Sequence, residues 1–188
     1  RGSGVYEKIV GSLERLKEID VLFGISVTIE RNNYEYWINS SALKNYLEMG
    51  VKIAFFFEHI PVDADGKDSE KVLTVDERNA FRAWINDFRK KYPILLIHSP
   101  GDEEKFGGCV SAGRGFAHIT PQGNMTPCPV TSASTHNVLT ESLKEALASD
   151  LFVKIREREH LLETDNSPCA LAAHPEELQK ILDEVKRK

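Results

Sequence analysis

The chain has 188 residues, with 24 Lys and Arg against 29 Asp and Glu and a formal net charge of −5. This balance disfavours a nucleic-acid partner, because proteins that bind such backbones usually carry a basic stripe. An apolar fraction of 41% indicates a globular chain, and its longest apolar runs are too short to cross a bilayer. Three cysteines are an odd number for a secreted disulfide framework, so we expect a cytoplasmic protein without a membrane partner.

The first hundred residues alternate between helix and strand patterns. Apolar residues recur every three or four positions in the helical segments, and β-branched or aromatic residues fill the strand segments. Thr74 and Glu77 predict a capping box at the start of the third helix. The predicted helices lie at 5–19, 43–50 and 74–88, the strands at 22–29, 51–57 and 93–98, and a polar loop at 61–69. This order predicts parallel strands joined by helical crossovers.

After residue 100 the pattern changes to short strands, loops and helices. Two short strands around Pro121–Asn124 predict a β-hairpin. Helices are expected near 141–148 and 150–160, a loop at 163–174, and a last helix that begins at Pro175. We therefore divide the chain into an α/β part at 1–100 and a small α+β part at 101–188.

All three cysteines, Cys109, Cys128 and Cys169, lie in the second part. Thiolates are soft ligands suited to zinc or iron–sulfur clusters. Free cysteines are also common as small buried apolar residues. Glycines precede Cys109 and prolines adjoin the other two, which favours rigid loops that approach a metal centre. From spacing alone, metal binding and simple burial both stay open.

Further residues carry a family resemblance. Cys109 is followed by thirteen residues, Gly123, four residues and Cys128, which resembles the SPASM or twitch-type auxiliary domain of radical S-adenosylmethionine enzymes. The matching stretches are Cys109–Arg114, Ile119–Asn124, Pro127–Pro129, Ser142–Leu147, Phe152 and Ile155–Arg156. Residues 1–100 resemble the C-terminal half of the family's barrel. The resemblance implies a partial, half parallel β/α barrel followed by a cysteine-bearing α+β extension with a β-hairpin.

The chain also departs from the family pattern. The family binds its catalytic cluster through a CxxxCxxC loop, whereas the cysteines here are separated by 18 and 40 residues. Full SPASM domains carry more cysteines, and the first residue is Arg, not Met. We expect the C-terminal portion of an oxidoreductase or maturase, inactive without its missing N-terminal half. Catalytic residues stay unassigned.

The resemblance implies two cofactors. Cys109, Cys128 and Cys169 would hold an auxiliary [4Fe–4S] cluster, which would position substrate or relay an electron. One iron would lack a cysteine ligand and could take a substrate atom, a histidine or a residue of the missing half. The intact enzyme would also bind and cleave S-adenosylmethionine. The substrate, a peptide or a small molecule, is undecided.

Polar residues at strand ends are candidates for cofactor contacts, because ligands bind at the carboxyl ends of parallel strands. Ser26, Thr28, Arg31 and Asn32 sit at and beyond the end of the first strand. The resemblance suggests S-adenosylmethionine contacts there and also around Glu58, His59, Ile60 and Pro61. Each of these polar groups has the alternative role of satisfying loop backbone.

Other interpretations remain. Zinc in a Cys₃ or Cys₃His module is the main alternative, and a degenerate scaffold with idle cysteines is another. The histidines that could complete a metal site are His98, His118, His136 and His174, although ordinary half-buried histidines are commoner. The charged run at 102–105 is assigned no role.

Because half a barrel leaves open sheet edges, we expect the strand at 22–29 to pair with another copy as a homodimer.

Overall fold

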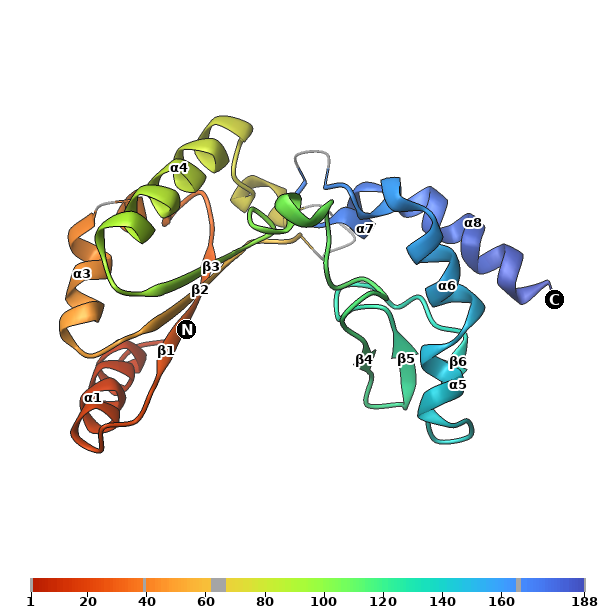
Figure 1. Ribbon diagram of the computed structural model, residues 1–188, viewed down its shortest axis with the longest axis horizontal. Coiled ribbons are helices and arrows are strands. Elements are labelled where there is room, and N and C mark those ends of the chain that lie inside the picture. The colour runs from red at the N-terminus through yellow and green to blue at the C-terminus, as the bar shows by residue number, and fades with distance from the viewer. Residues whose placement is uncertain (1, 39, 62–66, 165–166, 188) are drawn as a thin grey trace. The chain divides into compact units, whose positions relative to one another are not determined.

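The computed structural model describes residues 2–38, 40–61, 67–164 and 167–187. The chain divides into two compact units, Arg1–Ser99 and Pro100–Lys188 (Figure 1). Most of the polar loop predicted at 61–69 falls on 62–66, outside the described residues.

A parallel sheet forms the centre of the first unit. Its strands are β1 (Gly24–Ile29), β2 (Ile53–Glu58) and β3 (Leu95–Ser99), in the order β1-β2-β3. Val27 lies opposite Phe56, which lies opposite His98. The helices are α1 (Val5–Glu18), α2 (Tyr34–Ile38), α3 (Ser40–Glu48) and α4 (Val75–Lys91), with a short 3₁₀ turn η1 (Lys67–Lys71). The predicted parallel alternation is confirmed, whereas α2 and η1 were not predicted.

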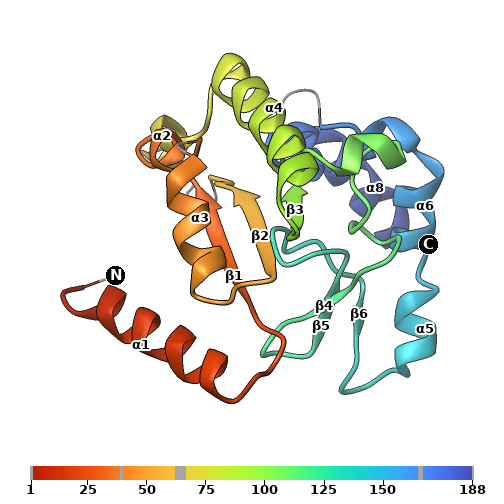
Figure 2. The ribbon, with the colours of Figure 1, turned by 60° about the vertical axis from the view of Figure 1, so that its left-hand side comes forward.

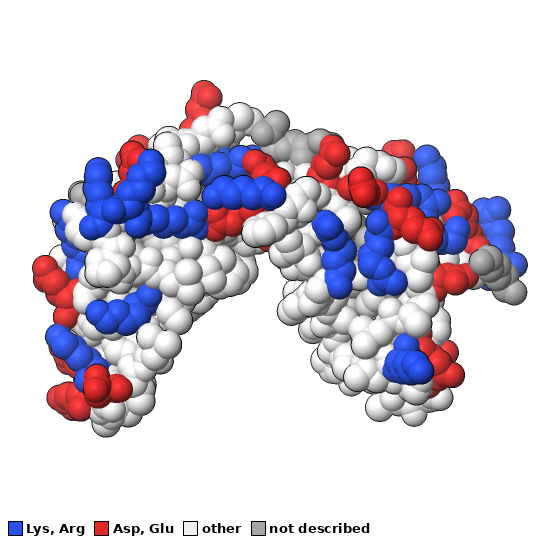
Figure 3. Space-filling model, in the orientation of Figure 1, with Lys and Arg blue, Asp and Glu red and all other residues white. Residues whose placement is uncertain are grey.

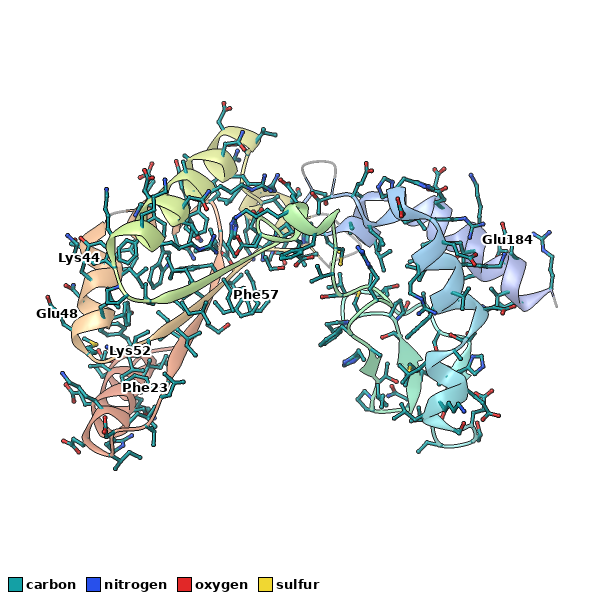
Figure 4. All side chains as sticks on the ribbon, in the orientation of Figure 1. Phe23, Lys44, Glu48, Lys52, Phe57 and Glu184 are labelled. Atoms are coloured by element: carbon teal, nitrogen blue, oxygen red, sulfur yellow. The ribbon has the colours of Figure 1, made fainter. Side chains whose placement is uncertain are left out.

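Helices α3 and α4 cover one face of this sheet (Figures 1 and 2). Thr74 and Glu77 form the predicted capping box of α4, and its Phe81 packs edge-on against Phe56 of β2. On the opposite face, the Phe55 and Phe57 rings stack with centroids 4.1 Å apart. Phe57 is 42% exposed and points away from α4 in Figure 4. Because side chains alternate across a strand, the helices bury only every second residue of β2.

The second unit contains a small antiparallel sheet. Its strands are β4 (His118–Ile119), β5 (Asn124–Thr126) and β6 (His136–Asn137). The predicted hairpin is confirmed by pairing of β4 with β5, and β6 is an addition that the sequence did not predict. Gly123 sits in its turn with φ of +82°, a conformation that glycine adopts without strain.

Short helices surround this sheet and its core. They are α5 (Leu143–Leu147), α6 (Asp150–Glu157), α7 (Ala170–Ala173) and α8 (Pro175–Lys186), with 3₁₀ turns η2 (Glu103–Phe106) and η3 (Glu159–Leu162). The helices predicted near 141–148 and 150–160, and from Pro175, are confirmed. The prediction of loop across 163–174 is wrong at α7, a single helical turn too short to show periodicity.

The two units therefore combine a parallel three-stranded sheet with a separate antiparallel sheet. This confirms the mixed α/β class predicted from the sequence, and closure into a barrel stays a prediction. None of the helices in the described ranges has the length and apolar character needed to span a membrane.

Candidate metal centre

The second unit brings its three cysteines to a common core. Cys109 follows η2, Cys128 follows β5, and Cys169 is the N-cap of α7. Cys128 is buried within this core, and the other two pack against it. Each thiol lies within electrostatic range of another. Residues up to 60 positions apart in the chain thus belong to, or pack against, the same core, because 169 − 109 = 60.

Each cysteine sulfur faces backbone amides of the two residues that follow its immediate neighbour. The N–H of Ala112 donates to Cys109 Sγ at 3.4 Å. Backbone amides also lower the thiol pKa values in part, those of Ser111 and Ala112 at Cys109, of Val130 and Thr131 at Cys128, and of Leu171 and Ala172 at Cys169. Hydrogen bonds of this kind stabilise negative charge on sulfur and tune iron–sulfur clusters.

The electrostatics of the three thiols follow from burial. Desolvation raises the pKa of Cys109, Cys128 and Cys169 above the usual thiol value, and the backbone amides oppose this only in part. The Glu103 carboxylate raises the pKa of Cys109 and Cys169 further. Without a cation the thiols therefore stay neutral. A bound metal reverses the balance, because a coordinating thiol is deprotonated.

Gly108 fixes the loop that carries Cys109. Its φ is +94°, and a Cβ built on it would lie 2.0 Å from the Leu162 carbonyl oxygen. That same oxygen accepts a hydrogen bond from the Cys109 N–H at 2.6 Å. The loop can approach η3 this closely only because residue 108 has no side chain.

We expect Gly108→Ala to destabilise the second unit by at least about 2 kcal/mol more than Gly107→Ala. Gly107 also has a positive φ of +77°, but a Cβ there meets nothing within 4 Å. Both variants carry the strain of a left-handed backbone conformation, but only Gly108→Ala adds a steric clash. The difference in stability between them therefore measures the clash. Hydrogen exchange of residues 150–162, measured by mass spectrometry, reports the difference. Equal exchange in the two variants would show that the approach to Leu162 is not needed.

In the first unit, the strand-end candidates fall on different faces of the sheet. Ser26 and Thr28 are exposed on β1, in register with Phe55 and Phe57 on the face that α4 does not cover. Beyond the strand, Arg31 is ion-paired with Glu77, with Nε and Oε2 3.2 Å apart. Asn32 is exposed and Ile60 is half-buried. Their role as cofactor contacts stays a prediction.

Glu58 lies on the other face, within a buried polar cluster. Its carboxylate accepts a hydrogen bond from Arg78 Nε at 2.5 Å and lies 3.1 Å from His98 Nε2. All three side chains are at most 4% exposed. Burial alone would raise the pKa of the Glu58 carboxyl, but hydrogen bonds from His98 and Arg78 and their charges outweigh it and lower that pKa. Glu58 therefore already has two buried partners.

Three of the four candidate histidines have partners other than the cysteines. His98 bonds Glu58, and His136 Nδ1 lies 3.0 Å from Thr135 Oγ1. The ring of His174 packs edge-on against that of His160. In the part of the chain that the structure describes, no three His, Cys, Asp or Glu side chains form a group that could hold a metal ion.

Two features near the cysteines were not identified from the sequence. Glu103 belongs to the charged run that received no role, yet it accepts a hydrogen bond from the Val110 N–H at 3.2 Å beside Cys109. Arg156 donates from Nη1 to the Gly113 carbonyl at 2.7 Å. Charged residues on an exposed helix or loop carry no sequence signal for such contacts, because solvated charges have the same pattern.

Comparison with known proteins finds a family that matches part of the second unit. Residues 109–172 match the SPASM family, described as an iron–sulfur cluster-binding domain, and the match begins at Cys109 and includes Cys128 and Cys169. The AdoMet-dependent heme synthase of Oleidesulfovibrio alaskensis is 25% identical over 159 residues, which is 72% of this chain and 40% of that relative. SuiB of Streptococcus suis shares the fold, with a TM-score of 0.58 at 14% identity.

The structural match to SuiB covers 80% of this chain and 40% of SuiB. The chain thus spans well under half the length of either protein. The resemblance to SPASM-type radical S-adenosylmethionine proteins is confirmed, and the second unit contains a radical S-adenosylmethionine-related iron–sulfur domain.

Proposed function

We propose that this chain is the C-terminal portion of a radical S-adenosylmethionine enzyme and that Cys109, Cys128 and Cys169 hold an auxiliary [4Fe–4S] cluster. The observation that carries the proposal is that Cys128 is buried in one core against which Cys109 and Cys169 pack, with the Ala112 N–H donating to Cys109 Sγ at 3.4 Å. Such a site fits a cluster, because soft thiolates bind iron and amide hydrogen bonds offset their negative charge.

The chain's own residues would hold the cluster and shield it. The loops at Cys109, Cys128 and Cys169 supply three ligands, which leaves one iron of a cubane without a cysteine. The buried apolar residues Leu151, Phe152 and Leu161 belong to the same core and would keep water from the cluster. When bound, the cluster would supply an electron relay or an iron atom that positions substrate. The substrate class is a peptide or a small molecule.

The first unit, residues 1–100, would be the late part of the enzyme's barrel, and residues 101–188 the auxiliary domain. Support comes from the parallel sheet, whose face opposite α4 is uncovered and exposes Phe57 and Leu95. A preceding half of the barrel would pair with the open edge of the sheet, enclose this face, bind the catalytic cluster, and share S-adenosylmethionine with Ser26, Thr28, Arg31, Asn32 and Ile60. The parent enzyme would be an oxidoreductase or maturase of the cytoplasm, where thiols stay reduced.

Anaerobic reconstitution with iron and sulfide tests the metal assignment. We expect about four iron atoms per chain and broad absorption near 400 nm, as for a cubane with thiolate ligands. Tightly bound zinc without iron would instead support the Cys₃ or Cys₃His zinc module. A chain that binds neither metal would support the degenerate scaffold and contradict the proposal.

We also infer that the isolated chain self-associates through β1. This strand is an edge of its sheet and contains neither proline nor charge between Gly24 and Ile29. Unprotected edge strands pair with other chains. Sedimentation velocity at micromolar concentration should show a homodimer, and a monodisperse monomer would rule the association out.

A further inference from the structure

Glu103 holds the loop of Cys109 at two points. Its backbone carbonyl accepts a hydrogen bond from the Gly108 N–H at 3.1 Å. Its side-chain Oε2 accepts a second one from the Val110 N–H at 3.2 Å. Gly108 and Val110 are the two sequence neighbours of Cys109. One glutamate therefore bonds the backbone on both sides of a proposed cluster ligand, and these bonds fix its carboxylate beside the loop.

The same carboxylate lies within electrostatic range of a second proposed ligand. Besides the thiol of Cys109 it acts on that of Cys169, and its negative charge raises the pKa of both. Glu103 belongs to η2 and is half-buried. A charge that is partly withdrawn from water is screened less than a surface charge. A weakly screened negative charge is thus held beside two of the three cysteines.

Two other charged side chains near the Cys109 loop are exposed. Arg114 Nη1 donates to the Cys109 carbonyl at 3.4 Å, and Glu104 is the next residue of η2. On the visible face of the second unit, Lys and Arg side chains lie beside Asp and Glu side chains (Figure 3). Solvated charges of mixed sign are screened over short distances. Glu103 is therefore the charge from which we expect the larger effect at the cysteines.

Reduction of a [4Fe–4S] cluster by one electron adds one negative charge to it. A fixed carboxylate nearby opposes that added charge, and net charge is one of the properties that set the potential of such clusters. We propose that Glu103 lowers the reduction potential of the auxiliary cluster held by Cys109, Cys128 and Cys169. The cluster would then be a stronger electron donor once reduced, which favours electron relay over substrate positioning alone.

This inference rests on the proposed function, whereas the attraction between the Glu103 carboxylate and a cation bound by the thiols does not. Two variants separate the charge of Glu103 from its hydrogen bond. Glu103→Gln removes the charge but keeps an oxygen that can accept the Val110 N–H. Glu103→Asp keeps the charge but is one methylene shorter and no longer reaches that N–H. Glu104→Gln removes the charge of the exposed neighbour and is the matched control.

The reduction potential is measured on the full chain after anaerobic reconstitution, by titration with dithionite followed by electron paramagnetic resonance. We expect Glu103→Gln to shift the equilibrium about tenfold toward the reduced cluster, which raises the potential by about 59 mV for one electron. Glu103→Asp and Glu104→Gln should leave the potential as in the parent chain. An unchanged potential in Glu103→Gln, or an equal shift in Glu104→Gln, would overturn the proposal. A shift in Glu103→Asp alone would also overturn it, because the glutamate would then only hold the loop.

Cadmium binding tests the same charge if the chain assembles no cluster. Cd²⁺ alone is titrated into the reduced chain, and the ultraviolet absorption of cadmium thiolates reports binding. Glu103→Gln should bind Cd²⁺ about tenfold more weakly than Glu103→Asp and Glu104→Gln do, because it has lost the attraction of the carboxylate. Equal affinity in the three variants would contradict the effect of Glu103. Iron content measured on the reconstituted samples separates the two claims, because missing iron refutes the cluster and leaves the cadmium comparison to decide on Glu103.

Discussion

Replacing Cys109, Cys128 or Cys169 with Ser should remove most of the iron that the reconstituted chain binds, from about four atoms to below about one per chain. Each thiol is one of only three available in the chain, and a cubane held by two cysteines leaves two irons open to solvent. Serine preserves size but replaces the soft sulfur with a hard oxygen, which suits iron–sulfur clusters poorly. Iron analysis and absorption near 400 nm measure the loss.

Val110→Ala is the matched control, since it alters the same loop but keeps its cysteine. Val110 is 41% exposed, so truncating it disturbs little packing. Its variant should bind iron as the parent chain does. Iron content unchanged in all three cysteine variants would contradict the assignment of these residues as ligands.

The grouping of the three cysteines in the second unit was predictable, because all of them follow residue 100. Its internal geometry was not. Amides that point at a sulfur depend on φ and ψ at the next three residues, which the sequence restricts only weakly. The fit of Gly108 against Leu162 joins segments 54 positions apart, since 162 − 108 = 54, and no local pattern encodes such a contact.

The fold was predictable where periodicity spans several turns or a whole strand. Long helices such as α4 and the three parallel strands follow from apolar spacing. The short elements α2, α7 and β6 have two to five residues, too few to display a period. Their conformation is set by packing against neighbouring elements, which a single sequence does not show.

Glu58 illustrates how strand alternation refines a site prediction. Its position at the end of β2 suggested a cofactor contact, because ligands gather at strand ends. Side chains of a strand alternate between faces, and Glu58 follows Ala54 and Phe56 on the buried face. The alternation alone therefore places its carboxylate toward the helices. In the structure that carboxylate meets Arg78 and His98.

Glu58→Gln should lower the free energy of unfolding of the first unit by about 3 kcal/mol. The substitution keeps the shape of the side chain but leaves the buried Arg78 guanidinium without the Glu58 charge. Both tryptophans of the chain, Trp37 and Trp84, lie in this unit. Tryptophan fluorescence during urea unfolding therefore reports on this unit alone.

The loss of stability caused by Glu58→Gln should also depend on pH. The pKa of Glu58 is lowered in the folded state, so its contribution is fully present above the ordinary carboxyl pKa of about 4.3. It is lost as pH falls below that value and through the lowered folded-state pKa. The difference in stability between the parent chain and Glu58→Gln should therefore be full at pH 7 and shrink in acid.

Glu48→Gln is the matched control, because Glu48 is exposed on α3 (Figure 4). Loss of a solvated surface charge changes stability by less than about 0.5 kcal/mol. If Glu58→Gln were as stable as Glu48→Gln at pH 7, the buried cluster would contribute no net stability. The free energy lost by removing these charges from water would then equal the free energy gained from their attraction. Some buried ion pairs behave in this way, and well-packed apolar residues can replace them without loss of stability. A loss that is full at neutral pH and shrinks only in acid is the result that the geometry of Glu58, Arg78 and His98 requires.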